Sequence, residues 1–221
     1  MATHAQQVTI VTDLTAHKAQ LALYPGPFSV LTADCPWPFE QNEDSDARWG
    51  TIDRHYAPMS MTELCLFPLP NLARDCVLFF WRVSAMQRQA LDVVKAWGFT
   101  DKAELVWRKR TKHGKRHFGM GRWTRAEHET AIIATRGNPQ ALARNIRSTF
   151  SAPVPVYPIG HPKEGHPIHS AKPEKFYDIV ERLAAGPYAE LFARRRRPGW
   201  SCFGDQVPAT EGVHAAVRSE A

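Results

Sequence analysis

Residues 28–39, FSVLTADCPWPF, are the most informative stretch of the chain, and the rest of the sequence is interpreted from them. The first six are mostly apolar, and they are followed by an acid, Asp34, and then by a proline-rich turn. A short apolar run that ends in such a turn predicts a buried strand with a loop at its carboxyl end. Because open α/β sheets bind ligands along that edge, we expect a ligand site beside Asp34.

This loop carries the groups needed to hold a planar base by its exocyclic amine. The amine's lone pair is delocalised into the ring, and two acceptors aimed at its N–H bonds favour a more tetrahedral, nucleophilic nitrogen. The Asp34 side chain and the Cys35 carbonyl can accept these bonds, and Pro36 stiffens the turn. Trp37 can stack on the base, which is worth about 1–3 kcal/mol. A methyl donor opposite the amine would complete a transfer catalysed by position and electrostatics. The same residues also occur in ordinary turns, so this motif alone leaves both readings open.

The composition predicts one α/β domain with a nucleic-acid partner as one option. The chain has 221 residues, 43% of them hydrophobic, and a net charge of +6. We expect residues 1–207 to form a single domain and residues 208–221 a flexible tail. A charge of this size suits a polyanion but is also common in proteins without one. The first residues lack a signal pattern and no apolar run reaches membrane-spanning length, so we expect a cytoplasmic protein without membrane contact.

Neither a metal site nor a disulfide framework is predicted. No two cysteines have C-x-x-C spacing, and the histidines of the proline-rich segment have the spacing H-x₄-H-x₂-H, which matches no helical ligand pair. The residues in question are Cys35, Cys65, Cys76, Cys202, His161, His166 and His169.

Apolar runs and helical patterns alternate along the chain. We expect strands at 28–33, 76–82, 103–109, 129–135, 188–193 and 199–204, a weak edge strand at 8–11, and helices at 16–23, 61–73, 84–97 and 173–185. The alternation predicts an α/β class with a mainly parallel, doubly wound sheet. The absence of G-x-G-x-x-G and phosphate-loop signatures argues against a nicotinamide dehydrogenase and an NTPase.

Three segments are predicted to be loops, namely 40–55, 110–125 and 138–169. The first is either a mobile flap over the substrate or a disordered insertion. The second, RTKHGKRHFGMGRWTR, mixes basic and aromatic residues. Lys112, Lys115 and Arg116 can follow phosphates while Trp123 stacks on a base, although a solvated basic hairpin is an equal alternative.

Several segments together resemble the messenger-RNA adenosine methyltransferases and their bacterial and phage DNA-methylating relatives, the MT-A70 family. The matches keep their order from about residue 28 to 207, which makes them more specific than any single motif. They are Asp34-Cys35-Pro36-Trp37 for D-P-P-W, Tyr56-Ala57-Pro58-Met59-Ser60, Phe79-Phe80-Trp81, Trp97-Gly98-Phe99, Val106-Trp107-Arg108-Lys109, Gly119-Met120-Gly121-Arg122-Trp123, His169-Ser170-Ala171-Lys172-Pro173, Glu190-Leu191-Phe192-Ala193-Arg194, Gly199-Trp200 and Gly204-Asp205-Gln206.

The resemblance implies a Rossmann-like methyltransferase that uses S-adenosylmethionine (SAM), of the permuted type with the catalytic motif near the N-terminus. It implies that Asp34–Trp37 hold the target adenine and that Tyr56 contacts the substrate. It also implies a SAM site, with Asp34 at its border, formed by Lys172, Arg194, Asp205 and Gln206. Cys35 departs from the family's first proline, but the acceptor there is a backbone carbonyl, which cysteine also has.

A second departure concerns the acid upstream of the motif that some members use for the SAM amine. Here it has no clear counterpart, and Asp13 is a weak candidate.

The function expected from this resemblance is methylation of the N6 amine of adenine in DNA. We expect a monomer or a homodimer of prokaryotic or phage origin, of the kind found in restriction-modification systems. The target base of duplex DNA must then be flipped out of the stack. The alternatives are an RNA substrate, a cytosine amine, and a catalytically inactive nucleic-acid-binding partner subunit, against which the intact Asp34 and Trp37 weigh.

Overall fold

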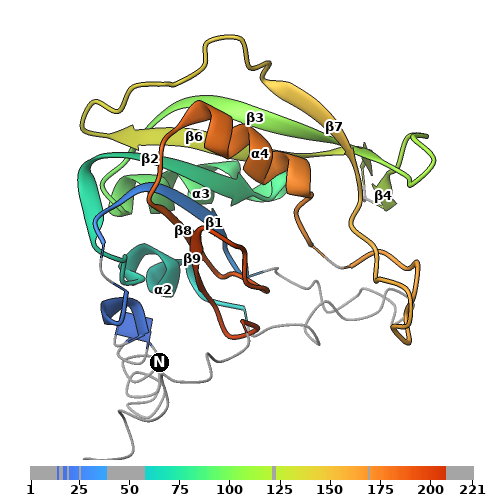
Figure 1. Ribbon diagram of the computed structural model, residues 1–221, viewed down its shortest axis with the longest axis horizontal. Helices are drawn as coiled ribbons and strands as arrows, with labels where there is room; N and C mark the ends of the chain where they lie inside the picture. The colour runs from blue at the N-terminus through green and yellow to red at the C-terminus, as the bar shows by residue number, and fades with distance from the viewer. Residues whose placement is uncertain are drawn as a thin grey trace, which may run out of the picture.

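A seven-stranded sheet with the order β7-β3-β6-β2-β1-β8-β9 forms the centre of the molecule (Figure 1). The computed structural model describes residues 14, 17–18, 20–24, 26–38, 58–120, 123–168 and 170–207. The strands of the sheet are β1 (Phe28–Asp34), β2 (Leu72–Arg82), β3 (Thr100–Arg110), β6 (His128–Arg136), β7 (Thr149–Pro153), β8 (Tyr188–Leu191) and β9 (Trp200–Phe203). A separate two-stranded sheet joins β4 (Gly119–Met120) to β5 (Arg125–Ala126).

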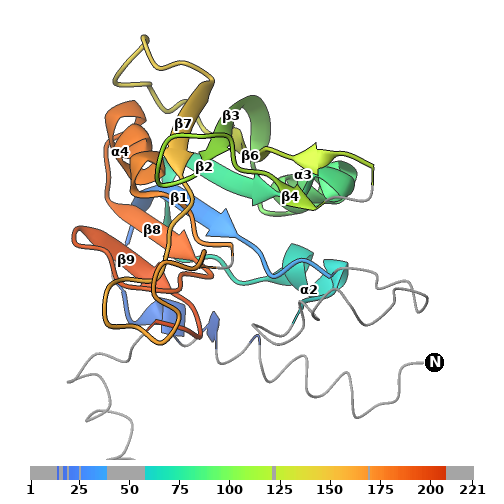
Figure 2. The same cartoon turned by 90° about the vertical axis from the view of Figure 1, so that its right-hand side faces the viewer.

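One strand of the main sheet runs against the others. β6 pairs antiparallel with β2 and β3, while the remaining pairs are all parallel. The arrows of β1, β2 and β8 accordingly point the same way in Figure 2. The carboxyl ends of the parallel strands and the amino end of β6 therefore meet at one edge of the sheet. The predicted α/β class with a mainly parallel sheet is confirmed.

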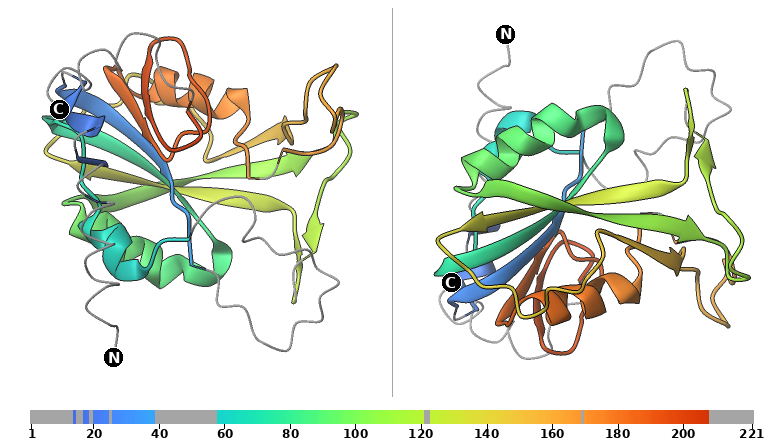
Figure 3. Two further views of the ribbon diagram at one scale, coloured as in Figure 1. Left: turned by 90° about the horizontal axis from the view of Figure 1, so that it is seen from below. Right: turned by 90° about the horizontal axis from the view of Figure 1, so that it is seen from above.

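Helices cover both faces of this sheet (Figure 3). The short α2 (Met61–Leu66) and α3 (Gln87–Ala96) lie on one face, and α4 (Glu174–Leu183) lies on the other. Each face has its own apolar core, because the alternate residues of a strand point to opposite sides. Of the described helices, none combines the length and the apolar character that crossing a bilayer requires.

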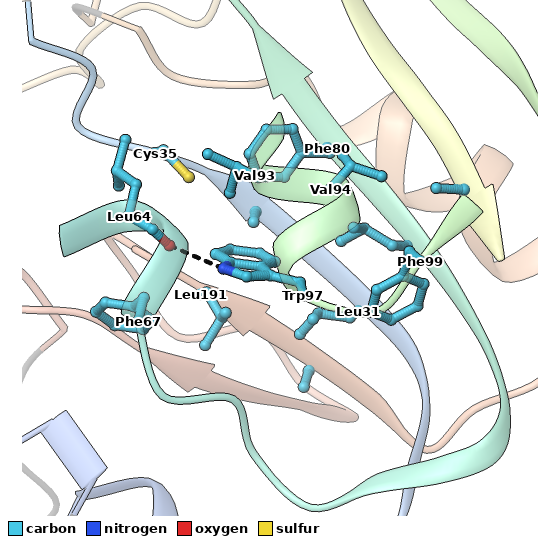
Figure 4. Packing of buried hydrophobic residues seen from close by; sticks show 14 of the residues in the cluster. Leu31, Cys35, Leu64, Phe67, Phe80, Val93, Val94, Trp97, Phe99 and Leu191 are labelled. Atoms are coloured by element: carbon cyan, nitrogen blue, oxygen red, sulfur yellow. Dashed lines mark hydrogen bonds between the residues drawn. The ribbon is translucent and has the colours of Figure 1, made fainter. Parts of the chain in front are cut away.

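The core under α2 and α3 anchors the turn that follows β1. Trp97, 4% exposed, donates a hydrogen bond from Nε1 to the Leu64 carbonyl at 2.8 Å and so ties the two helices together (Figure 4). The Cys35 side chain points into the same cluster, beside Leu64 and Val93. A turn whose side chain is fixed in packed core holds its backbone groups in place.

The predicted helix start at residue 61 is confirmed, but its predicted end at residue 73 is too late. The Ser60 hydroxyl accepts from the Glu63 N–H at 3.2 Å and Glu63 accepts from the Ser60 N–H at 2.7 Å, which completes a capping box. The helix stops at Leu66 because Pro68 cannot continue it, and β2 starts at Leu72.

Other boundaries also differ from the prediction. The predicted helix 84–97 begins with a short 3₁₀ turn, η2 (Ser84–Met86), and β8 ends at Leu191 rather than at residue 193. Strand β7 lies in the segment 138–169, which was expected to be a loop. Its five residues, TFSAP, are too few to show a strand pattern in the sequence. Within 110–125, the structure has β4 and the start of β5 in place of an irregular loop.

Some predictions fall on residues that the structure does not describe. These are the edge strand 8–11, Asp13, the loop 40–55, Tyr56, His169 and the tail 208–221. Residues 17, 18 and 20–22 have helical backbone, which agrees with the helix expected near 16–23.

Candidate active site

A cavity of about 1080 Å³ opens at the edge where the parallel strands end. Its walls come from the ends of β1, β2, β3, β8 and β9 and from the start of β6. Ligand pockets for small molecules measure about 300–1,000 Å³. The cavity therefore has room for a cofactor and for part of a second ligand.

Asp34 stands in the cavity wall at the carboxyl end of β1. The strand is held between β2 and β8, and Asp34 itself is in register with Trp81. Its side chain is 23% exposed and accepts a hydrogen bond at Oδ2 from Lys172 Nζ at 2.7 Å. The carboxylate is therefore reachable from the cavity and held in one orientation.

Lys172 links two carboxylates. Its side chain is 7% exposed and also contacts Glu129 Oε2 at 3.1 Å, while its Nζ donates to the Ser170 carbonyl at 3.1 Å and lies 5.0 Å from the centre of the Trp81 ring. Burial alone would lower the pKa of Lys172, but Asp34 and Glu129 outweigh burial and raise it above the ordinary value. The amine is therefore a permanent cation.

Glu129 is the next member of this chain of alternating charges. It receives a second ammonium group, Lys109 Nζ, at 2.6 Å from Oε1. Burial would raise the pKa of Glu129, yet Lys172 and Lys109 together lower it to about 2. The order Asp34, Lys172, Glu129, Lys109 thus crosses the cavity wall from β1 to β3 through the antiparallel strand β6.

The turn after Asp34 presents backbone groups rather than side chains. Burial, followed by the charge of Asp34, raises the pKa of the Cys35 thiol well above its ordinary value, so the thiol stays protonated. The Cys35 carbonyl accepts the Trp37 N–H at 2.9 Å, and the Pro36 carbonyl accepts the Met59 N–H at 2.9 Å. Since a carbonyl has two lone pairs, Cys35 can accept one more hydrogen bond.

Trp37 has a packing role in this conformation. It is 2% exposed and meets Phe80 edge-on at 5.7 Å between ring centres. Trp37 lines the cavity but its ring is almost fully covered in this conformation, so stacking of Trp37 on a base stays a prediction. Its Nε1 has no hydrogen-bond partner among the described residues.

The opposite wall is formed by the loops after β8 and β9. Arg194, Asp205 and Gln206 line it together with the apolar rings of Phe192 and Phe203. The two loops touch at Gly204, where an added Cβ would lie 2.2 Å from the Ala193 carbonyl oxygen. Glycine thus permits the close approach that brings both loops to the same cavity.

The comparisons with known proteins agree with this geometry. Residues 28–206 match the family model MT-A70. The chain belongs to the MT-A70 family.

Relatives in the family come from animals and from a bacterium. The chain is 28% identical to the N(6)-adenosine-methyltransferase MT-A70-like protein of Drosophila melanogaster, with 82% of this chain and 27% of that protein covered. It is 25% identical to the human N(6)-adenosine-methyltransferase catalytic subunit METTL3, with 86% and 29% covered. It is 26% identical to the type II methyltransferase M.MunI of Mycoplasma sp, with 82% and 78% covered. The chain thus spans less than a third of the two animal relatives.

MT-A70 proteins are N6-adenine methyltransferases that use SAM as methyl donor. The cavity suits such a group, because it joins apolar rings for an adenine to polar groups for ribose hydroxyls and an amino acid. The tight contact at Gly204 holds the loops after β8 and β9 together, and these two loops carry the polar groups. Lys172, Arg194, Asp205 and Gln206, which the resemblance assigned to SAM, all line this cavity together with Asp34.

The predicted substrate residues lie in different places. Trp123 lines the cavity and is 92% exposed, so its ring is available for stacking. Lys112, Lys115 and Arg116 are exposed on the hairpin between β3 and β4, outside the lining of this MT-A70 cavity. Tyr56 is outside the described residues.

Sequence reasoning missed Glu129 and Lys109. Both were assigned to strands, and nothing in the residue pattern shows that β6 runs against its neighbours. That reversal brings the first residues of β6 to the same edge as the last residues of β1 and β3. An acid at the start of an antiparallel strand is the signal that would have pointed to the site.

A second acidic group missed by sequence reasoning is Glu190, which is partly buried between β8 and α4. Tyr177 on α4 donates its hydroxyl to Glu190 Oε1 on β8 at 2.7 Å, and Arg197 lies 3.9 Å from the centre of the tyrosine ring. Burial raises the pKa of Tyr177 well above its ordinary value and that of Glu190 to about 7, to which the charge of Asp34 also contributes. Glu190 is thus partly protonated near neutral pH.

Proposed function

We propose that this protein transfers a methyl group from SAM to the exocyclic N6 amine of adenine in DNA. The observation that carries the proposal is the Asp34 carboxylate, which ends a buried strand, is 23% exposed in the wall of a large cavity, and is held by Lys172. Acceptors fixed in advance at a reacting centre are the usual source of such catalysis.

The chain's own residues hold the amine. Asp34 and the Cys35 carbonyl accept its two N–H bonds, which favours a tetrahedral nitrogen with an available lone pair. Lys172 keeps the Asp34 carboxylate in place, so little reorganisation is needed when the amine arrives. Bound SAM supplies the methyl group on the side of Arg194, Asp205 and Gln206. The nitrogen's lone pair would form the new N–C bond while the methyl–sulfur bond of SAM breaks with its electron pair left on sulfur, giving S-adenosylhomocysteine. The nitrogen would then lose one proton, which Asp34 can receive.

The comparison with M.MunI supports DNA as the substrate. The shared segment makes up 78% of that type II methyltransferase but less than a third of the two animal relatives. The chain is therefore closer in extent to this bacterial relative than to the two animal relatives.

RNA is the second candidate substrate. The matches to an N(6)-adenosine-methyltransferase catalytic subunit favour it, since adenosine is a ribonucleoside. A catalytically inactive partner subunit fits less well, because Asp34, Lys172 and the cavity are all present.

Further features belong to the same proposal. They are one methyltransferase domain over residues 1–207, a monomer or homodimer, and a role in restriction-modification. A cytoplasmic location is included because all four cysteines are free thiols, which suits a reducing compartment.

One labelling experiment tests the proposal. The protein is incubated with methyl-labelled SAM and with DNA or RNA in separate reactions, and each polymer is digested to nucleosides. We expect the label in N6-methyldeoxyadenosine. Label in N6-methyladenosine alone would assign the RNA alternative, and label in neither would contradict adenine methylation.

A further inference from the structure

A smaller groove of about 340 Å³ lies beside the main cavity, along β3 and the start of β6. Its lining includes Arg108, Arg110 and Arg116, together with Lys109, His128 and the acid Glu127. The basic side chains outnumber the acidic one, so the groove is a concentrated patch of positive charge.

Strand geometry explains why the arginines gather there. Successive side chains of β3 point to opposite faces, so Arg108 and Arg110 share a face while Trp107 and Lys109 point to the other. His128 stands opposite Arg108 in the register with β6. The hairpin folds back through an antiparallel bridge between Arg110 and Arg116, which adds the third guanidinium group.

These guanidinium groups are not neutralised within the part of the chain that the structure describes. Arg108, Arg110 and Arg116 form no ion pair and no side-chain hydrogen bond there. Lys109, by contrast, is paired with Glu129 at 2.6 Å. Arg108 and Arg116 are exposed, so they can reach an anion without first breaking an internal contact.

The groove adjoins the cavity that contains Asp34. Lys109 and His128 line both of them, so the two hollows share a border at the end of β3 and the start of β6. If an adenine base occupies the cavity, as the proposed function requires, a phosphate beside that nucleotide is within reach of this border, and the groove is a basic surface next to it. Arginine presents a planar fork that matches the two free oxygens of a phosphate.

We infer that this groove, which we call the phosphate groove, binds one phosphodiester of the target strand next to the methylated adenine. The inference rests on the proposed function but assigns residues that it does not use, above all Arg108 and Arg110. It places the backbone contact on the sheet beside the cavity, with the tip of the hairpin at Lys112 and Lys115 farther along.

Single phosphate replacements test this inference. Duplexes are made around an adenine that the labelling experiment shows to be methylated, each with one neutral methylphosphonate near that adenine, and fluorescence anisotropy measures their dissociation constants. For the wild type, we expect one position at which replacement weakens binding roughly tenfold, because one charge-assisted contact is lost. For the double variant Arg108→Gln, Arg110→Gln, binding of the unmodified duplex is weaker, and the same replacement has no further effect.

A matched control and a salt titration complete the experiment. Lys102→Gln removes an exposed cation at the far end of β3 and keeps the wild-type pattern of sensitive positions. The slope of log K against log salt falls by about one for each phosphate contact that the double variant loses.

Two results would overturn the inference. If the wild type methylates the duplex and no single methylphosphonate weakens binding, the phosphate groove is wrong while the proposed function stands. If the double variant keeps the wild-type sensitivity at the same position, the contact lies elsewhere. Absence of any nucleic-acid methylation would remove the proposed function and this inference together.

Discussion

At the scale of single residues, the site is a chain of alternating charges. Lys172 lies between Asp34 and Glu129, and Glu129 lies between Lys172 and Lys109. Each buried charge thus has a partner of opposite sign, which offsets the cost of removing it from water. Loss of one member leaves its neighbours poorly compensated and free to turn, so we expect changes at Glu129 to alter both stability and the position of Lys172.

The lowered pKa of Glu129 makes stability depend on acid. Its pKa is about 2 in the folded protein against an ordinary 4.5, so its stabilising contribution is complete above pH 4.5 and disappears as the pH falls toward 2. The contribution amounts to at most about 3 kcal/mol. In urea unfolding, we expect the wild type to lose more free energy of unfolding between pH 5 and 3 than Glu129→Gln. The variant Glu104→Gln, at an acid that is 57% exposed, is the control, and equal losses in all three proteins would refute the assignment.

The pKa shift of Glu190 makes stability depend on pH in the opposite direction. Its pKa is raised to about 7 in the folded protein, so the protonated form is favoured there, and its contribution is complete below pH 4.5 and lost as the pH rises through 7. We expect Glu190→Gln, which can still accept the Tyr177 hydroxyl, to reduce the fall in unfolding free energy between pH 5 and 8. Identical pH profiles for the variant and the wild type would show that Glu190 is ionised in the fold.

At the scale of elements, the reversed strand β6 and the paired loops after β8 and β9 build the site. β6 brings Glu129 to the edge where β1 ends, and the two loops bring Arg194 and Asp205 to the opposite wall. Gly204 is the contact on which this wall depends, because an added Cβ would lie 2.2 Å from the Ala193 oxygen and 2.7 Å from the Ala193 nitrogen. Backbone atoms cannot move aside as the end of a side chain can.

The variant Gly204→Ala tests the importance of that contact. We expect it to lose roughly 1–3 kcal/mol of stability, as overpacked sites do, and to bind SAM more weakly because both loops are displaced. Urea unfolding and titration calorimetry measure the two effects. Ser201→Ala, on the preceding strand β9, serves as the control. Unchanged SAM affinity in Gly204→Ala would mean that these loops do not form the cofactor wall.

The extent of prediction from sequence also differs by element. The strand before Asp34, the helix that starts at residue 61 and the α/β class follow from local patterns, and they are confirmed. The contact between Asp34 and Lys172 could not be derived from local patterns, because 138 residues separate the two and only the fold brings them together. The short β7 and the direction of β6 depend on pairing with β3, which no local pattern encodes.

At the scale of the whole molecule, the features of the proposed function gather at one edge of the sheet. The cavity, the alternating charges and the phosphate groove all lie where the parallel strands end. The chain has a net charge of +6, and three of its positive side chains, Arg108, Arg110 and Arg116, line the phosphate groove. A local excess of positive charge attracts a polyanion and makes its binding sensitive to salt.

Removal of charge from the hairpin tests this view of the surface. In the triple variant Lys112→Gln, Lys115→Gln, Arg116→Gln, we expect weaker binding of nucleic acid and a shallower dependence of affinity on salt. Anisotropy with a labelled duplex between low and moderate salt provides the measurement. Affinities that match the wild type at every salt concentration would exclude the hairpin as a contact surface.

The central claim is that Asp34 grips the amine that receives the methyl group. Its most direct test is the single-turnover rate of methyl transfer by Asp34→Ala at saturating SAM, with SAM affinity and thermal unfolding measured on the same variant. The account predicts a loss of at least about 100-fold in rate, as for the removal of one oxyanion-hole donor, with the fold and most SAM binding retained. A variant that transfers methyl groups at the wild-type rate would contradict it.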